Sequence, residues 1–523
     1  MKIKATRNIL IIVGMVIFII NLIAMPVMAS NTQPDIYVNT NGWWRNSEVF
    51  NVNISTPIQA ALDDATSNEH IFVYNGTYTE NVIVNKQITL QGEGMDKVSV
   101  TAKAHDHVFK LIADQVDISG FTIIGAMKKK TGKAGVFLGL DHPGSGVDHC
   151  VISNNIILNN HVGIFLVNSN NDNLLTNNNV SNNWRGIYLA SSDNNTITDN
   201  IVHIHEKYGI HLASSDDNTL TGNIISSNLK YGICLESSNN NRLIDNIADS
   251  NDKYGFYLAS SSGNTLTGNT ANLNDKCGFC LASSDDNTLT DNIAESNKKF
   301  GISLISSGSN ILINNIANSN DKYGIGLYSS DDNTLTDNTA NSNQKFGIGL
   351  SYSSNNILAG NIANSNDKYG ISLDSSDNNK LTDNIANSNN RYGIALISSN
   401  GNILSSNTAN LHNIFGISLT SSSDNTFTDN SISDNKFGII LNSSNNNLIY
   451  NNYFSNTVNA NDDGDNIWNT MKTPGENIAG GSYLGGNYWS DYTGDDTDGD
   501  GIGDTLIPYN RVIGKGGDYL PLI

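Results

Sequence analysis

The sequence predicts an all-β protein, a right-handed parallel β-helix of 23-residue coils, and two repeated columns of residues carry this prediction. Twelve glycines stand 23 residues apart from Gly163 to Gly416, and eleven asparagines keep the same step from Asn200 to Asn430. A fixed period of this length indicates one supersecondary unit stacked on copies of itself. A left-handed β-helix needs hexapeptide periods, and a leucine-rich repeat has a leucine spacing that is absent here.

Each coil is expected to contain three short strands. Ile or Phe usually follows the repeated glycine, and Leu stands three positions after it, as at Gly324 and Leu327. An aromatic residue usually precedes the glycine, and alternation of period two is typical of a strand with one buried face. Two further apolar phrases follow asparagines such as Asn333 and Asn338. These asparagines tolerate left-handed turns and can hydrogen-bond their copies, so they are predicted to be structural.

The two ends of the chain differ from the repeats. Residues 1–29 have the form of an export signal, with basic residues before an apolar run and small residues at the end. The run is also nearly long enough to remain as a membrane anchor. Residues 30–104 are expected to form an N-terminal cap and the first coils, residues 105–456 the β-helix repeats, and residues 457–523 an acidic C-terminal cap.

A short capping helix is expected in the N-terminal cap. Ser55 and Thr56 supply capping hydroxyls, Pro57 suits the first helical turn, and good helix formers follow as far as Asp63. Such a cap would cover the open strand edges at one end of the solenoid, which could otherwise pair with other chains.

The composition excludes one class of partner and argues against disulfides. A formal net charge of -21 opposes nucleic-acid binding, which needs clustered cations. Cys234 and Cys280 occupy the same position two coils apart, about 9.6 Å at the strand spacing and beyond disulfide reach. Cys277 and Cys280 alternate to opposite faces of one strand. With Cys150, the cysteines are therefore predicted to be mostly free thiols.

The terminal sequences resemble a known family. The phrases around IQAAL, YNGTYTENV and ITLQGEG, between residues 58 and 94, are similar to the opening of NosD-like members of the carbohydrate-binding and sugar-hydrolase β-helix superfamily. The phrase LGGNYWSDY at residues 484–492 resembles the closing segment of archaeal, methanogen-type surface proteins in that family. The resemblance implies a pectin-lyase-like solenoid, exported to the cell surface or the periplasm. It also implies a polysaccharide or envelope-glycan partner, with copper as another suggestion.

A calcium site is expected in the acidic C-terminal cap. Asp496, Asp498 and Asp500 stand at positions one, three and five of a loop, with the carbonyl of Ile502 at seven and Asp504 at nine. Calcium prefers such clustered hard oxygens. Position twelve is not the bidentate Glu of an EF-hand, so another Asp would have to complete the shell. A solvated acidic loop is the alternative.

A carbohydrate-binding face is expected on the early coils. Polysaccharide-active β-helices bind along an exposed strand face, and aromatic and basic residues fill the outward columns two positions before and after the glycine. Rings can stack on sugars, and lysines can meet carboxylates. The later coils have small residues at plus two and look bland; exposed decoration is the alternative interpretation. The candidates are His161, Phe165, Trp184, Tyr188, Lys207, His211, Lys230 and Tyr257.

Enzyme activity and metal handling remain alternatives to binding alone. A lyase or epimerase needs a base near the sugar, and a hydrolase needs two carboxylates at a set separation. The face offers Glu236 and His211 but no acid pair. For copper, His105, His107, His142, His149, His203 and His205 lie in the first half of the chain. Alternation would put paired histidines on one strand face, but Cys and Met ligands are not clustered with them in the sequence.

Overall fold

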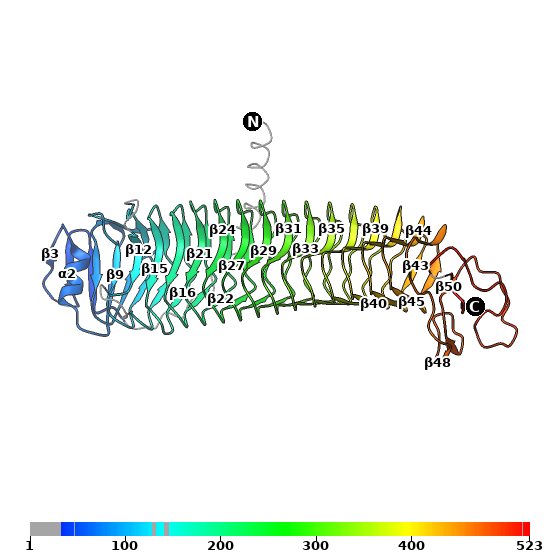
Figure 1. Ribbon diagram of the computed structural model, residues 1–523. Helices are drawn as coiled ribbons and strands as arrows, with labels where there is room; N and C mark the ends of the chain where they lie inside the picture. Colours follow the sequence, from blue (N-terminus) through cyan, green and yellow to red (C-terminus); the bar gives the residue numbers. More distant parts are fainter. Residues whose placement is uncertain (1–32, 47, 128–131, 141–145, 515) are drawn as a thin grey trace, which may run out of the picture.

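Parallel strands stack into one long solenoid. The computed structural model describes residues 33–46, 48–127, 132–140, 146–514 and 516–523. The capping helix lies at one end of the stack and the C-terminal segment at the other (Figure 1). The predicted signal at residues 1–29 and His142 lie outside the described residues. No helix in the described part of the chain has the length and hydropathy needed to cross a membrane.

Sheet C carries the face on which the candidate site lies. Its strands pair in parallel from one coil to the next. Seventeen strands are found among the described residues, against about fifteen coils expected, because β6, β9 and β12 precede the thirteen strands that carry the periodic glycines and β47 follows them. The strands are β6 (Val82–Val84), β9 (Phe109–Leu111), β12 (Ala134–Leu138), β15 (Val162–Val167), β18 (Arg185–Ala190), β21 (Tyr208–Ala213), β24 (Tyr231–Glu236), β27 (Tyr254–Ala259), β29 (Cys277–Ala282), β31 (Phe300–Ile305), β33 (Tyr323–Tyr328), β35 (Phe346–Ser351), β37 (Tyr369–Asp374), β39 (Tyr392–Ile397), β41 (Phe415–Thr420), β44 (Phe437–Asn442) and β47 (Val458–Asp462).

Sheet A supplies the second strand of each coil. It is parallel except at its start, where β1 pairs with β2 and β2 with β3 in antiparallel fashion. Its strands are β1 (Ile36–Asn39), β2 (Gly42–Arg45), β3 (Asn51–Val52), β4 (Glu69–Val73), β7 (Ile88–Gly92), β10 (Asp117–Ser119), β13 (Val151–Ser153), β16 (Leu174–Thr176), β19 (Thr196–Thr198), β22 (Thr219–Thr221), β25 (Arg242–Ile244), β28 (Thr265–Thr267), β30 (Thr288–Thr290), β32 (Ile311–Ile313), β34 (Thr334–Thr336), β36 (Ile357–Ala359), β38 (Lys380–Thr382), β40 (Ile403–Ser405), β42 (Thr426–Thr428) and β45 (Leu448–Tyr450).

Sheet B is the third side and shrinks to single parallel bridges in the middle coils, from Thr270 to Thr408. A small antiparallel pair, β48 (Thr473–Pro474) and β49 (Tyr483–Leu484), lies in the C-terminal segment. The strands of sheet B are β5 (Gly76–Thr79), β8 (Val98–Thr101), β11 (Thr122–Ile124), β14 (Ile156–Leu158), β17 (Asn179–Ser181), β20 (Ile201–His203), β23 (Ile224–Ser226), β26 (Ile247–Asp249), β43 (Ser431–Ser433), β46 (Tyr453–Ser455) and β50 (Tyr488–Trp489).

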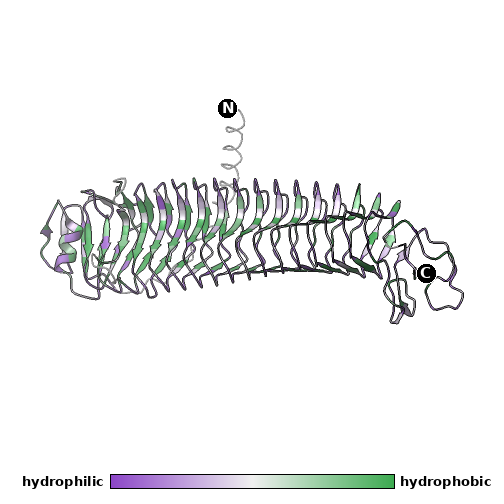
Figure 2. Cartoon of the chain, viewed as in Figure 1, coloured by the Kyte–Doolittle hydropathy of each residue, from purple (hydrophilic) through white to green (hydrophobic). Residues whose placement is uncertain are grey.

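The core is a continuous column of aliphatic side chains inside the coils. Ile325, Leu327 and Leu335 are fully buried, as are their copies in neighbouring coils. Hydrophobic residues recur in every coil along the solenoid (Figure 2). The repeated glycine fits a tight corner of this core. A Cβ at Gly324 would lie 2.7 Å from the carbonyl oxygen of Ala317 and 2.7 Å from the Cβ of Ala340.

Buried asparagines form three hydrogen-bonded ladders; the sequence analysis predicted the two that include Asn333 and Asn338, and the structure adds a third through Asn343. Asn338 is fully buried, and its Nδ2 donates to the Leu312 carbonyl and to Asn361 Oδ1 at 2.9 and 3.0 Å. Their conformation differs from the expectation, however. The left-handed residue is the one before each asparagine, such as Asp337 with φ 55°. The asparagines are therefore selected for their side-chain hydrogen bonds.

The predicted capping helix is α2 (Pro57–Asp64), but its cap is not the expected hydroxyl. Thr56 makes no side-chain capping hydrogen bond. The carboxylate of Glu80 accepts the backbone N–H groups of Ile58 and Gln59 at 3.1 and 3.0 Å instead. Glu80 is fully buried, so a carboxylate from the following coil satisfies the helix N-terminus.

Candidate functional site

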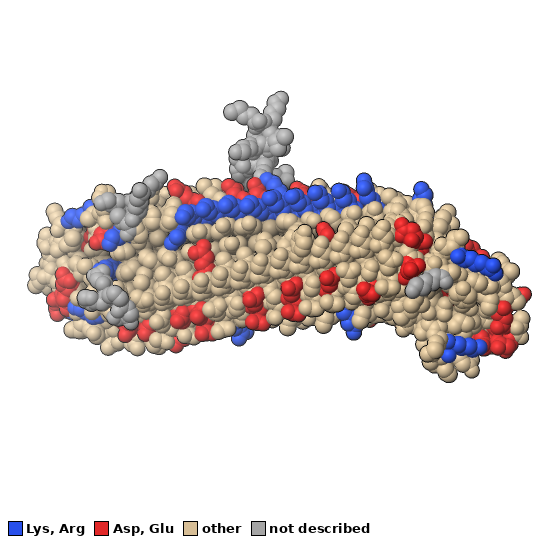
Figure 3. Space-filling model, in the orientation of Figure 1, with Lys and Arg blue, Asp and Glu red and all other residues tan. Residues whose placement is uncertain are grey.

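The lysines predicted on sheet C belong to one continuous row of stacked cations. The backbone N–H of each member donates to the carbonyl of the preceding member at 2.8–3.1 Å. The row appears as a blue ridge along the solenoid (Figure 3). Nine cations at a spacing of about 4.8 Å span about 38 Å. This cation row consists of Lys207, Lys230, Lys253, Lys276, Lys299, Lys322, Lys345, Lys368 and Arg391.

An aromatic ladder runs beside the cation row, which corrects the strict alternation expected from the sequence. The rings of Tyr208 and His211 contact each other at 4.6 Å, and those of Tyr254 and Tyr257 at 5.1 Å. Positions minus one and plus two therefore share the outer face. The reason is the glycine between them, which strand pairing skips, as at Gly209. The aromatic ladder comprises Tyr208, Tyr231, Tyr254, Phe300, Tyr323, Phe346, Tyr369, Tyr392, Phe415 and Phe437.

The same break in alternation corrects the placement of two cysteines. Cys277 and Cys280 lie on one face and interact with each other, rather than pointing to opposite faces. The prediction of free thiols is nevertheless confirmed, because all four cysteines are buried and none forms a disulfide: Cys150, Cys234, Cys277 and Cys280.

The predicted residues of the early coils stack on one another. His161 stacks on Trp184 at 4.5 Å, and Phe165, Tyr188 and His211 form a second stack at 4.7 and 4.9 Å. Because the rings cover one another's faces, the surface presents ring edges. Lys207 lies over Trp184 at 4.2 Å.

Arg185 was missed by the sequence analysis. Its guanidinium lies 4.3 Å from the Tyr188 ring and 4.7 Å from the Trp184 ring. It occupies the position before Gly186 that other coils fill with an aromatic residue. That substitution of a cation for an aromatic residue was the signal available in the sequence. Arg185 joins the aromatic stacks to the beginning of the cation row.

A shallow hollow lies on the later coils that looked bland in the sequence. Its floor includes Gly349 and Ser372, and one wall is the aromatic ladder at Tyr323, Phe346 and Tyr369. The opposite wall is formed by Tyr328, Ser351, Asp374 and Ile397. Small residues at plus two therefore create space beside the aromatic ladder, whereas the larger residues of the early coils fill it.

His211, Cys234 and Glu236 meet on the outer face of β21 and β24. His211 Nε2 lies 3.2 Å from Glu236 Oε2, and Cys234 Sγ lies 3.8 Å from Glu236 Oε1. Burial lowers the pKa of His211, and the hydrogen bond from His211 lowers the pKa of Glu236. The sequence analysis did not group Cys234 with His211 and Glu236 as one site, although Cys234 stands one period of 23 residues after His211.

The paired histidines do not form the shared face that alternation suggested. His205 takes the place of a ladder asparagine: its Nδ1 accepts the Asn183 N–H at 3.1 Å, and burial lowers its pKa to about 3. His203 lies outside, because the chain turns at Ile204 with φ 59°. Among the described residues, the group that combines a histidine with a soft ligand is His211, Cys234 and Glu236.

The acidic loop of the C-terminal cap brings three of the predicted ligands together. Ligand oxygens of Asp496, Asp498 and Asp504 lie within 4.8 Å of one another. Asp496 accepts backbone N–H groups across the loop, including that of Gly501 at 2.8 Å. Asp500 is instead paired with Lys472.

Comparisons with known proteins agree with this architecture. Residues 62–250 and 339–494 match the family described as periplasmic copper-binding protein (NosD). The chain belongs to the NosD family. Residues 263–409 also match the right-handed β-helix region, so the predicted fold class is confirmed.

Individual relatives of this NosD-family chain cover it only in part. A cell surface glycoprotein of Methanothermus fervidus is 35% identical over 129 residues, which is 24% of this chain and 20% of the glycoprotein. The periplasmic alginate epimerase AlgG has a TM-score of 0.42 at 14% identity, over 62% of this chain and 82% of its own. The DFA-IIIase of Arthrobacter chlorophenolicus has a TM-score of 0.41 at 13% identity, over 53% and 86%.

Proposed function

We propose that this protein is an exported cell-surface β-helix whose sheet C face binds a linear acidic polysaccharide. The observation that carries the proposal is the cation row, an uninterrupted line of nine positive side chains on a chain whose net charge is -21. The resemblance to a surface glycoprotein supports the location.

Stacked cations repel one another unless an anion lies along them. Two unit charges at about 4.8 Å in water cost about 0.9 kcal/mol before salt screening, and each interior member has two such neighbours. Burial and the charges of Arg185 and Lys230 lower the pKa of Lys207. A polymer carrying carboxylates or sulfates at regular intervals would offset this repulsion along the whole row.

The shape beside the row favours an extended chain over a compact ligand. The hollow on the later coils runs between the aromatic ladder and the column formed by Tyr328, Ser351, Asp374 and Ile397. Sugar rings seated there would contact Tyr323, Phe346 and Tyr369 while their acidic groups faced the lysines. The stacked residues of the early coils would extend the same track past Trp184 and Tyr188.

The test is binding of an acidic and a neutral polysaccharide, polygalacturonate and a neutral glucan, by isothermal titration calorimetry. Lys322→Glu reverses one charge in the middle of the row. Lys380→Glu makes the same change in net charge on sheet A and is the matched control. We expect Lys322→Glu to weaken polygalacturonate binding about tenfold, or about 1.4 kcal/mol, and the control to leave it unchanged. Equal affinity for the neutral glucan, or equal effects of the two variants, would contradict the proposal.

We also propose that calcium orders the C-terminal cap. Support comes from the convergence of Asp496, Asp498 and Asp504, which repel one another without a cation. Asp500 and the carbonyl of Ile502 would complete the set once Lys472 is displaced. Calcium should raise the melting temperature of the cap, measured by the fluorescence of its tryptophans, and a chelator should reverse the change. Identical melting with calcium and with chelator would rule out the site.

A further inference from the structure

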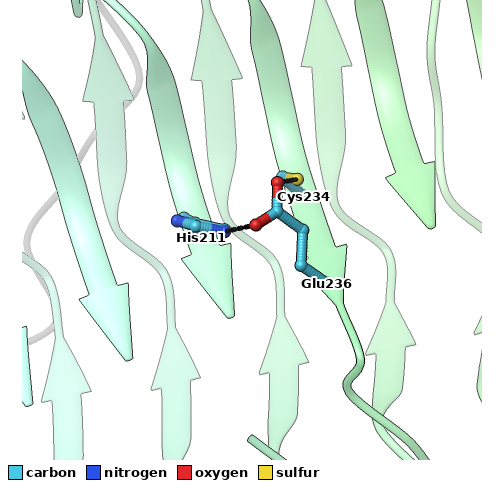
Figure 4. A group of neighbouring side chains, drawn as sticks. All are labelled: His211, Cys234 and Glu236. Carbon is cyan, nitrogen blue, oxygen red and sulfur yellow. Dashed lines mark hydrogen bonds and ion pairs between the residues drawn. The ribbon is translucent and has the colours of Figure 1, made fainter. Parts of the chain in front are cut away.

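The outer face of sheet C contains three potential metal ligands that no part of the glycan proposal uses. His211 on β21 lies directly opposite Cys234 on β24, and Glu236 follows two residues later on the same face. Figure 4 shows the Glu236 side chain folded back so that its carboxylate faces both His211 and Cys234. The three groups therefore converge from two neighbouring coils.

Two distances between these groups, each to a different carboxylate oxygen of Glu236, are close to the edges of a tetrahedral metal site. Zinc binds nitrogen and carboxylate oxygen at about 2.0–2.2 Å and sulfur at about 2.3 Å, so the edges between two ligands are about 3.3–3.8 Å. His211 Nε2 and Glu236 Oε2 are 3.2 Å apart, and Cys234 Sγ and Glu236 Oε1 are 3.8 Å apart. One ligand atom from each residue lies within 4.8 Å of the others.

The burial of the group is consistent with a site that is closed on the side of His211 and Cys234 and open to solvent at Glu236. The side chain of His211 is 3% exposed, whereas that of Glu236 is 45% exposed. Cys234 is fully buried. Nδ1 of His211 has no hydrogen-bond partner, and Nε2 has only the Glu236 carboxylate, at 3.2 Å. An unpaired nitrogen is costly for a buried imidazole. Solvent can reach the group past Glu236, and the fourth coordination position would face the glycan surface.

The electrostatics of the site change when a dication is present. Burial, followed by the charge of Glu236, raises the pKa of the Cys234 thiol well above its usual value. A bound dication deprotonates a coordinating thiol. The carboxylate and thiolate would then balance the ion, and Arg185 would remain paired with its aromatic neighbours.

We propose that His211, Cys234 and Glu236 bind one divalent transition-metal ion through imidazole nitrogen, thiolate and carboxylate, leaving a fourth position open to solvent. Both Zn²⁺ and Cu²⁺ bind this type of ligand set, and Cu²⁺ binds more tightly to a given nitrogen, oxygen and sulfur site. The family description names copper. Among the described residues, this is the group of potential ligands that combines nitrogen and sulfur. The open position would allow the ion to contact a ligand on sheet C.

The proposal is tested by titrating the full chain with Zn²⁺ and, separately, with Cu²⁺, with calcium present to occupy the acidic loop. Glu236→Gln removes a ligand at a half-exposed position with little risk to folding. Glu206→Gln makes the same change at an exposed position one coil earlier and is the matched control. We expect one strong site whose dissociation constant rises at least tenfold in Glu236→Gln and is unchanged in Glu206→Gln. If Glu236→Gln weakens the binding of one ion alone, that ion is the one that the site binds. Equal affinities of the two variants for both ions would overturn the proposal.

A spectroscopic readout checks the thiolate directly. Co²⁺ replaces Zn²⁺ in tetrahedral sites, and its charge-transfer absorption reports a bound thiolate. Cys280→Ser is the matched control, because Cys280 occupies the same column two coils later without a neighbouring His and Glu. The charge-transfer band should be present in the wild type and in Cys280→Ser and be lost in Cys234→Ser. A band that survives in Cys234→Ser, or that is absent from the wild type, would contradict thiolate coordination.

Discussion

Replacing one ladder asparagine, Asn338→Ala, should destabilise the neighbouring coils strongly. The Asn338 side chain donates to the Leu312 carbonyl and to Asn361 Oδ1, and its Oδ1 accepts the backbone N–H and the Nδ2 of Asn315 at 3.0 and 2.9 Å. Alanine removes all four hydrogen bonds. It leaves buried backbone groups of Asn315 and Leu312 without these partners in a site that water does not reach.

The magnitude follows from the number of buried groups left unpaired. Each costs about 1–3 kcal/mol, so two backbone groups and a broken ladder give about 3–6 kcal/mol. Because a solenoid couples mainly adjacent coils, the loss should be local and a single global unfolding energy would not report it well. Amide hydrogen exchange followed by mass spectrometry measures the opening of each coil separately.

We expect amides in the coils on either side of residue 338 to exchange at least about a hundredfold faster, and amides around Ile210 to be unchanged. Gln344→Ala is the control from the same coil, since Gln344 is exposed and its side chain bonds only Asp321 at the surface. An acceleration below threefold, or one equal to that of the control, would refute the reasoning. It would show that ladder hydrogen bonds contribute no more than solvated ones.

Three further predictions concern the core, the cap and the binding face. Gly347→Ala would place a Cβ 2.7 Å from the carbonyl oxygen of Gly370, and circular dichroism should show a lower melting temperature, corresponding to about 1–3 kcal/mol. Burial raises the pKa of Asp518 to about 6, above its unfolded value. Its contribution to stability therefore falls as pH rises through that value. The cap should melt at a higher temperature at pH 5 than at pH 7, and this difference should be smaller in Asp518→Asn. Replacing Trp184 and Tyr188 together by alanine should abolish polygalacturonate binding in the titration while the circular dichroism spectrum is retained. No change in melting temperature, an unaltered pH dependence in Asp518→Asn, or retained affinity would contradict the respective prediction.

The 23-residue period is enough to predict the repeated part of the fold. In a solenoid each residue lies next to its own copy one period away. The environment of Gly324, Leu327 or Asn338 can therefore be predicted from the residues at the same position of neighbouring repeats. The same rule relates two of the proposed metal ligands, because Cys234 follows His211 by one period. Likeness within a column does not show this pair, because His211 and Cys234 are chemically different residues at the same position of adjacent coils.

The period does not show which columns share a face or how the ends are closed, because both depend on three-dimensional packing. Alternation of period two assumes an extended backbone throughout, and the glycine corner breaks it, which brings the aromatic ladder and the cation row to one surface. Small residues such as Gly349 looked featureless in the sequence, yet they make the hollow, because a cavity depends on what the surrounding walls leave empty. Glu80 caps α2 from outside the periodic region, where no repeat relates a residue to its neighbour in space.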